Sequence, residues 1–313
     1  MTNARAPLFT VLIPLFNKGA RIEATLASIA AQTFDDYEGV VVDDGSTDDG
    51  PARVAAWSDR VRLLRQANAG PGIARNRGIA AARGAWIAFL DADDLWHPDH
   101  LRTLARVIAA CPDAAVVATG FTRGETLAAA PTDTGGTARY LDFFGDHGLI
   151  WTSALAVRAS ALATERFGAA WPGEDIELWI RLALRHRFAA HSARTAVYIQ
   201  RTGGAMDSQT AAVTVPLERQ PVFVTLAGAL ADPTLADRHA ALARFRDALL
   251  IEYTRPALFN GQIALARSYL RALRAGGGRA PALYRWLARL PGPIATAGSR
   301  LYGTAKRLGR PAT

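Results

Sequence analysis

The chain has 313 residues, half of them hydrophobic, with 36 Lys and Arg against 28 Asp and Glu and a net charge of +8. This composition allows a sizeable buried core and excludes a largely disordered chain. A single cysteine, Cys111, excludes an intramolecular disulfide and suits a reducing compartment.

The first half of the chain alternates short apolar, β-rich runs with segments of helical periodicity. The expected strands are residues 8–15, 37–46, 61–67, 85–94 and 113–121. The expected helices are residues 19–33, 70–84 and 97–111. Strands that alternate with helices predict a mostly parallel sheet with helices on its faces, and ligands bind such sheets beyond the carboxyl ends of the strands.

The next part of the chain is less regular. Residues 122–152 are rich in Gly, Thr and Asp, and we expect loops there. A helix is expected after Gly173, where apolar residues recur at helical spacing: Ile176, Trp179, Ile180 and Leu184. A last strand is expected at 194–203.

The C-terminal region differs from the rest of the chain in both pattern and charge. Beyond residue 212 only helical patterns remain. Residues 213–313 carry 15 Lys and Arg against 5 Asp and Glu, whereas residues 1–212 carry 21 basic and 23 acidic side chains. We therefore predict two parts, an α/β domain over 1–212 and a basic helical region over 213–313.

The basic region has two interpretations. Residues 279–313 carry 7 Lys and Arg and no acid, interleaved with Leu, Tyr and Trp, as in ordinary amphipathic helices packed on a domain. The same charges could attract an anionic membrane surface, with Trp286 or Tyr302 at the interface.

No apolar run reaches the ~18 residues that cross a bilayer, so we expect a cytoplasmic protein, peripheral on the inner membrane face under the second interpretation. No nucleic-acid-binding motif accompanies the charge, and no nucleic-acid partner is expected.

Acidic residues follow two of the expected strands. "DADD" sets Asp91, Asp93 and Asp94 together directly after an apolar strand, and because like charges repel, a cation should belong there. An Asp-x-Asp pair can bind a divalent cation and leave positions for phosphate oxygens, although a solvated acidic turn has the same composition. In "VVVDDGS", Asp44 could accept hydrogen bonds from a nucleobase or ribose, or belong to an ordinary Asp-Gly turn.

Two expected helix starts also carry charged residues. "NAGPGIARN" opens a helix with glycines that can approach a phosphate, and Arg75 could bind that phosphate bidentately. In "GEDIELW", Asp175 lies where a carboxylate could take a proton from a hydroxyl. The alternatives are a solvated arginine and acidic residues that balance a helix dipole.

The order of these motifs, with "IPLFN" at 13–17 before them, resembles the family 2 glycosyltransferases of the GT-A fold over about residues 8–205. The resemblance implies a GT-A type α/β fold, a nucleoside-diphosphate sugar donor, a divalent cation (Mg or Mn) and inversion at the anomeric carbon. No G-x-G-x-x-G follows the first strand, which excludes a two-domain dinucleotide dehydrogenase. A non-catalytic module that keeps the fold and binds a nucleotide sugar or glycan is the alternative function.

The resemblance also implies roles for single residues. Those expected to bind the nucleotide are Pro14, Phe16, Asn17, Asp44, Arg75 and Asp91. Asp93 is expected to bind the metal, and Asp175 to deprotonate the acceptor hydroxyl. The expected donor is a UDP-sugar, and the expected acceptor is a glycan or a lipid-linked molecule of surface polysaccharide or glycolipid assembly. Arg201 stands about where family members often have a His, so either it contacts the diphosphate or its loop is organised differently.

Overall fold

The computed structural model describes residues 6–58, 61–124, 136–146, 150–169, 173–199, 215–273 and 282–291. Contacts divide the chain into two compact units, residues Met1–Gly204 and Ala205–Thr313. This division, the predicted boundary at residue 212 and Arg201 all lie in the segment 200–214, outside the described residues.

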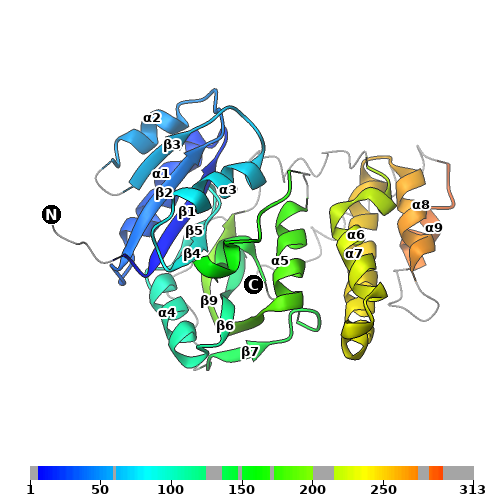
Figure 1. The fold of residues 1–313 in the computed structure, drawn as a ribbon. Coiled ribbons are helices and arrows are strands. Elements are labelled where there is room, and N and C mark those ends of the chain that lie inside the picture. The colour runs from blue at the N-terminus through cyan, green and yellow to red at the C-terminus, as the bar shows by residue number, and fades with distance from the viewer. Residues whose placement is uncertain are drawn as a thin grey trace. The chain divides into compact units, whose positions relative to one another are not determined.

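A nine-stranded sheet runs through the first unit (Figure 1). Its order is β3-β2-β1-β4-β8-β6-β9-β5, with β7 paired to β9. The strands are β1 (Phe9–Leu15), β2 (Tyr37–Asp43), β3 (Val61–Arg65), β4 (Trp86–Phe89), β5 (Leu95–Trp96), β6 (Ala114–Gly124), β7 (Arg139–Leu141), β8 (Leu155–Arg158) and β9 (Arg187–Ile199).

The sheet has a parallel half and a mixed half. Strands β3, β2, β1 and β4 run parallel to one another, as the alternating sequence pattern predicts. Beyond β4, strand β8 is antiparallel to both β4 and β6, and β5 and β7 are antiparallel to β9. The predicted α/β class is confirmed, but the expectation of loops throughout 122–152 is wrong because β7 lies there. The last predicted strand also begins earlier, at Arg187.

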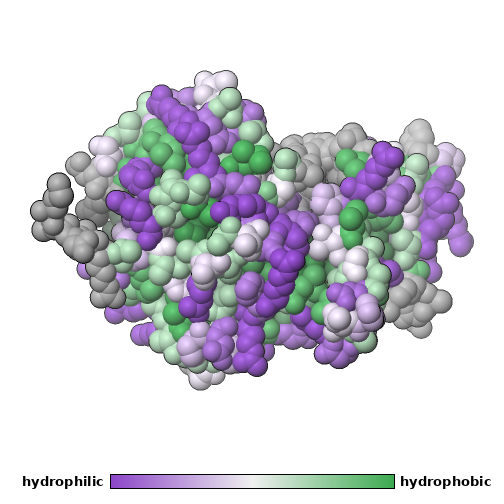
Figure 2. All heavy atoms as spheres, in the orientation of Figure 1, coloured by the Kyte–Doolittle hydropathy of each residue, from purple (hydrophilic) through white to green (hydrophobic). Residues whose placement is uncertain are grey.

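Helices lie on both faces of this sheet. In the first unit they are α1 (Gly19–Ala30), α2 (Gly50–Ala55), α3 (Pro71–Ala81), α4 (His100–Ala110) and α5 (Glu174–Arg185), with 3-10 helices η2 (Thr152–Ala154) and η3 (Ala159–Leu162). Helix α5 is amphipathic: one side is buried, and Figure 2 shows hydrophilic residues along its position. Trp179 of α5 packs edge-on against Phe89 of β4, with ring centroids 5.5 Å apart.

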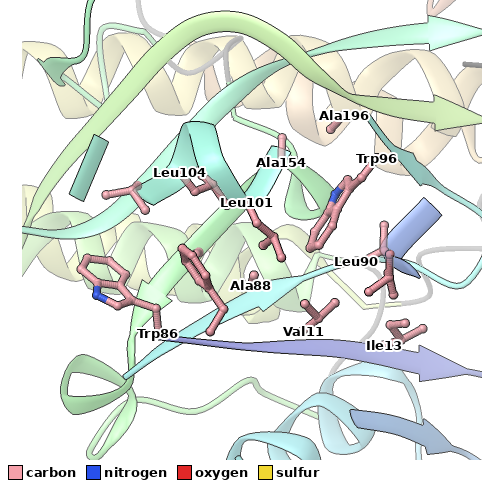
Figure 3. Packing of buried hydrophobic residues seen from close by; sticks show 14 of the residues in the cluster. Val11, Ile13, Trp86, Ala88, Leu90, Trp96, Leu101, Leu104, Ala154 and Ala196 are labelled. Carbon is pink, nitrogen blue, oxygen red and sulfur yellow. The ribbon is translucent and has the colours of Figure 1, made fainter. Parts of the chain in front are cut away.

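The main core lies on one face of β1 and β4. Val11 and Ile13 are two residues apart on β1 and therefore point to the same face. Figure 3 shows them on the side of the sheet where Leu101 and Leu104 of α4 pack. All four are fully buried. This packing leaves the opposite face of β1, where Leu12 points, to helix α3.

Helix α3 approaches β1 closely because a glycine lies at the contact. A Cβ added at Gly78 would lie 1.8 Å from Cδ1 of Leu12, which is fully buried. The absence of a side chain at Gly78 therefore sets the depth of α3 against the sheet. Arg75 lies one turn earlier on the same helix, so its position depends on this contact.

The second unit is helical, as predicted for the C-terminal region. Its helices are α6 (Pro221–Ala231), α7 (His239–Phe259), α8 (Ile263–Ala272) and α9 (Ala282–Leu287), with 3-10 helices η4 (Leu217–Arg219) and η5 (Pro233–Arg238). Tyr269 of α8 is fully buried, and the Gln220 side chain donates a hydrogen bond of 2.9 Å to its hydroxyl. Within the described ranges no helix combines the length and the apolar character that crossing a membrane requires.

The contact between α3 and β1 predicts that Gly78→Ala destabilises the protein. The added methyl overpacks the core, so the free energy of unfolding should fall by about 1–3 kcal/mol, although Ala is ordinarily ~1 kcal/mol better than Gly in a helix. Urea denaturation followed by circular dichroism measures this change. The matched control is Gly228→Ala in α6, where no atom lies within 4 Å of an added Cβ. This control should be neutral or stabilising, and equal behaviour of the two variants would contradict the packing argument.

Candidate active site

The predicted site residues come together at one edge of the sheet. Strands β1, β2 and β4 are parallel, and their carboxyl ends therefore lie at the same edge. "FNKG" follows β1, "DGSTDDG" follows β2 and "DADD" follows β4. This edge, with the start of α5 beside it, is the candidate active site.

The loops after β1 and β2 are tied together by Asn17. Its backbone has a positive φ of 51°, a conformation that Asn tolerates better than most residues. The Asn17 side-chain oxygen accepts a hydrogen bond of 2.8 Å from the backbone N–H of Thr47. The backbone N–H of Asn17 donates to Oγ of Ser46 at 3.1 Å. Beside it, the Phe16 side chain is 44% exposed. The loop therefore holds an aromatic ring at the protein surface, next to Pro14 of β1.

Asp44 fixes the start of α3. It is buried, and Oδ1 accepts hydrogen bonds from Nε2 of Gln66 at 2.7 Å and from the N–H of Ala69 at 2.9 Å. Oδ2 accepts from the N–H of Gly70 at 2.8 Å, directly before the helix. A carboxylate has about four lone-pair sites, so Asp44 can still accept one more donor. Its contact with a nucleobase or ribose stays a prediction.

Arg75 is buried between two carboxylates. Nη1 donates to Oε1 of Glu174 at 2.9 Å, and Nη2 donates to Oδ1 of Asp91 at 2.8 Å. Burial alone would lower the pKa of Arg75, but the charges of Asp91 and Glu174 raise it above the usual arginine value. Arg75 is therefore charged. Each terminal nitrogen carries a second N–H, and the predicted contact of Arg75 with phosphate stays a prediction.

Two cations lie at "DADD". Arg75 pairs with Asp91, and Nζ of Lys18, the residue before α1, forms an ion pair with Oδ2 of Asp93. Burial raises the pKa of Asp91, and the charges of Asp93 and Asp175 add to that shift while Arg75 opposes it. The sequence predicts a cation here, and Arg75 and Lys18 place positive charge beside these carboxylates. The predicted metal ion stays a prediction.

The carboxylates of Asp91 and Asp93 have the right chemistry for a divalent cation, but they are few. Among the residues that the structure describes, no group of three or more His, Cys, Asp or Glu could hold a metal ion. Mg²⁺ is commonly held by one or two carboxylates together with substrate phosphates and water. These donors therefore fit a metal that binds jointly with a diphosphate.

Asp94 connects three parts of the chain. Oδ2 accepts hydrogen bonds from Nε1 of Trp151 at 3.0 Å and from Oγ of Ser153 at 2.5 Å, and Oδ1 accepts from the N–H of Ile199 at 3.0 Å. The side chain is buried, and burial together with the charge of Asp91 raises the pKa of Asp94 to about 8. These contacts give Asp94 a structural role that holds the loop after β4 in place.

Asp175 lies in the first turn of α5. The helix begins after Gly173, whose positive φ of 104° favours glycine. Oδ2 of Asp175 accepts a hydrogen bond of 2.9 Å from Oγ1 of Thr152, and the side chain is half-buried. Burial raises the pKa of the neighbouring Glu174 to about 7, and the charge of Asp175 adds to the shift. Asp175 is therefore the more accessible carboxylate of the pair.

Sequence reasoning missed several residues of the site. Thr152 and Ser153 lie in and beside the range that was expected to be loop, and nothing local in that range indicates their partners. Lys18 directly follows "IPLFN", and its position beside that motif was the one signal available. Glu174 and Asp175 are adjacent acids, and the sequence alone does not distinguish their roles. The hydrogen bond from Arg75 to Glu174 is what distinguishes them.

Solved structures share this fold. The structure of S. aureus TarS 1-349 in complex with UDP-GlcNAc has a TM-score of 0.66 and 19% sequence identity, and the match covers 97% of this chain and 93% of that one. The mannosyltransferase PcManGT from Pyrobaculum calidifontis, in complex with GDP-Man and Mn²⁺, has a TM-score of 0.57 and 20% identity over 98% of this chain and 88% of that one. The predicted GT-A type fold is confirmed.

Curated relatives match about a third of the chain at higher identity. The succinoglycan biosynthesis protein ExoO of Rhizobium meliloti (strain 1021) is 48% identical over 102 residues, which is 32% of this chain and 29% of that protein. The uncharacterized glycosyltransferase YibD of Escherichia coli (strain K12) is 42% identical over 98 residues, or 30% of this chain and 28% of that protein. The matches thus span less than a third of either relative's length.

The family model described as Glycosyl transferase family 2 matches residues 10–166. This range includes "IPLFN", Asp44, Arg75 and "DADD", which are the motifs that meet at the carboxyl edge of the sheet. Because the match covers half of the chain, the protein belongs to glycosyl transferase family 2.

Proposed function

We propose that the protein is an inverting, metal-dependent glycosyltransferase that moves a sugar from a nucleoside-diphosphate donor to a hydroxyl of a glycan or lipid-linked acceptor. The observation that carries the proposal is the arrangement of carboxylates around Arg75. Asp91, beside Asp93, contacts it from the strand-end side, and Glu174, beside Asp175, contacts it from the helix side. In this arrangement Asp93 can serve the donor, and Asp175 can serve the acceptor.

The donor side would use the loops at the ends of β1, β2 and β4. The exposed ring of Phe16 offers a flat apolar surface to a nucleobase, next to Pro14 and the fixed Asn17. Asp44 retains capacity for one further donor, and Asp91 can reach a ribose or a metal-bound water. The two structural neighbours were solved with UDP-GlcNAc and with GDP-Man, which supports a nucleotide-sugar donor here, and we propose a UDP-sugar.

Asp93 would hold the divalent cation, with Asp91 beside it. When bound, Mg²⁺ or Mn²⁺ supplies positive charge that stabilises the leaving nucleoside diphosphate. Lys18 lies at the same carboxylate and adds positive charge to that side of the site. The Mn²⁺ in the PcManGT complex supports this proposal.

Asp175 would act as the general base. The Thr152 hydroxyl donates to Oδ2 of Asp175 and so orients the carboxylate. A hydroxyl that gives its proton to this carboxylate can attack the anomeric carbon from the face opposite the leaving group, which inverts the configuration.

The name of ExoO, a succinoglycan biosynthesis protein, supports a glycan or lipid-linked acceptor and a role in surface polysaccharide or glycolipid assembly. A binding module without activity is the rival function, and donor turnover separates the two.

Metal removal tests the donor side. Hydrolysis of a panel of nucleotide sugars should require Mg²⁺ or Mn²⁺ and stop in EDTA, because the leaving diphosphate then lacks its counter-charge. Asp93→Asn should abolish turnover while leaving the circular dichroism spectrum intact. Asp113→Asn is the matched control, an exposed aspartate whose nearest cation is Arg187 at 3.8 Å, and it should keep full activity. Full wild-type turnover in chelator would overturn the metal-dependent proposal.

Substitution of the base tests the acceptor side. Asp175→Asn keeps the shape of the side chain but removes its ability to take a proton, so turnover should fall about 10²- to 10⁴-fold. Nucleotide affinity measured by calorimetry should stay within a few-fold of the wild-type value. A near-normal rate would move the base elsewhere. Glu174 is a poor substitute because it is buried and paired with Arg75.

We also propose that the basic C-terminal region binds an anionic membrane surface. In α9 and just after it, Arg285, Trp286 and Arg289 are exposed, with 56% of Trp286 accessible. No acidic residue follows Glu252, so no carboxylate close by in the sequence offsets this charge. Lipid attraction of roughly 1 kcal/mol per basic residue near the surface would then place the enzyme beside a lipid-linked acceptor on the inner membrane face. Residues 279–281 and 292–313 of the predicted segment, which include Tyr302, lie outside the described residues.

Vesicle flotation tests the membrane proposal. The full-length protein should float with vesicles that contain phosphatidylglycerol at low salt and be released by high salt, since the attraction is electrostatic. Arg285→Glu with Arg289→Glu should weaken flotation, whereas Arg187→Glu, an exposed arginine of the first unit, should not. Failure of the wild-type protein to float with anionic vesicles would reject the proposal.

A further inference from the structure

Arg75 joins two segments that lie far apart in the sequence. Its guanidinium donates to Asp91, which follows β4, and to Glu174, the first residue of α5, at 2.8 and 2.9 Å. The side chains of Arg75 and Glu174 are each only 6% exposed, and that of Asp91 is 27% exposed. These three residues are referred to below as the Asp91–Arg75–Glu174 bridge.

Residues 167–168, which precede α5 in the chain, also restrain Arg75. Its guanidinium carbon lies 5.3 Å from the centroid of the Phe167 ring. The next residue, Asn76, exchanges two hydrogen bonds of 2.9 Å with the backbone of Phe167. A Cβ added at Gly72 would lie 2.5 Å from the carbonyl oxygen of Gly168. Helix α3 therefore packs tightly against residues 167–168. Because of this packing, the Arg75 side chain has little freedom to turn away from the bridge.

We propose that Arg75 and Glu174 are positioning residues that set the general base relative to the donor side of the site. The bridge fixes the first turn of α5 against the end of β4, and Asp175 is part of that turn. Glu174 acts through Arg75 and touches no substrate. The inference rests on the proposed function of Asp175 and deepens it, because it names the residues that hold that carboxylate in place.

The chemistry of the pair suits this role. A guanidinium is a planar fork that can hold two carboxylates in a fixed geometry, which a lysine ammonium cannot do. Glu174 and Asp175 are adjacent in the chain, so a shift of Glu174 moves Asp175 with it. Misplacement of a reacting group by ~1 Å costs about 10²-fold in rate. Loss of the bridge should therefore lower turnover while the nucleotide loops after β1 and β2 stay intact.

A direct phosphate contact from Arg75 would give a different pattern. Arg75 would then leave at least one carboxylate when the donor binds, and its loss would weaken binding of a diphosphate more than binding of a monophosphate. Glu174 would contribute little to turnover in that case. The two roles thus differ in their effects on binding and on rate.

The experiment compares Glu174→Gln with Glu177→Gln by nucleotide-sugar hydrolysis. Glu177 lies in the same helical turn and is also a buried member of an ion pair, but its partner is Arg181 of the same helix at 2.7 Å. Glu174→Gln should lower kcat about 10- to 100-fold with the donor KM within a few-fold, whereas Glu177→Gln should keep a near-normal kcat. Equal losses in both variants would mean that helix stability, and not positioning, is responsible.

Arg75→Lys supplies a second, independent measurement. Affinities for UDP and UMP, or for GDP and GMP if the wild-type protein binds guanine nucleotides, should fall by the same small factor. The double variant Arg75→Lys with Glu174→Gln should lose no more kcat than Arg75→Lys alone, since both act through one bridge. A selective loss of diphosphate affinity, or a normal kcat in Glu174→Gln, would overturn the inference. If the wild-type protein turns over no donor, or Asp175→Asn is fully active, the proposed function fails instead.

Discussion

Four carboxylates lie together at one edge of the sheet, those of Asp91, Asp93, Glu174 and Asp175. Their mutual repulsion would destabilise the folded unit unless other groups offset it. Arg75 offsets it for Asp91 and Glu174, Lys18 for Asp93, and the Thr152 hydroxyl donates to Asp175. Each partner comes from a different element of the fold. The site is thus a charge arrangement that only the assembled unit can hold.

Helix α3 links the two sides of this arrangement. Its start is held by Asp44, on the proposed nucleoside side, through the N–H groups of Ala69 and Gly70. Its middle carries Arg75, which contacts the proposed acceptor side through Glu174. Its depth against β1 is set by Gly78, where an added methyl group would overlap Leu12. One rigid helix therefore positions both sides of the site.

The parallel half of the fold could be predicted from sequence because each of its strands is paired with a helix of regular period. The antiparallel strands could not, since β5, β7 and β8 have only two, three and four residues and show no clear alternation. Asp44, Asp91, Asp93 and Asp175 were recognisable because they sit beside strand ends and a helix start. Their partners were not, because Lys18, Thr152 and Ser153 meet them through long-range contacts that carry no local pattern.

The span of the bridge in sequence affects how the unit forms. Arg75 and Glu174 are 99 residues apart, and Asp94 and Ile199 are 105 apart, so both contacts close very long loops. Closing such loops costs entropy that is recovered only after nearby β-α segments have formed, and contacts of this kind slow folding. During synthesis the strand ends after β1, β2 and β4 emerge well before α5. The growing chain therefore carries Arg75 with only one of its two carboxylate partners until residue 174 leaves the ribosome.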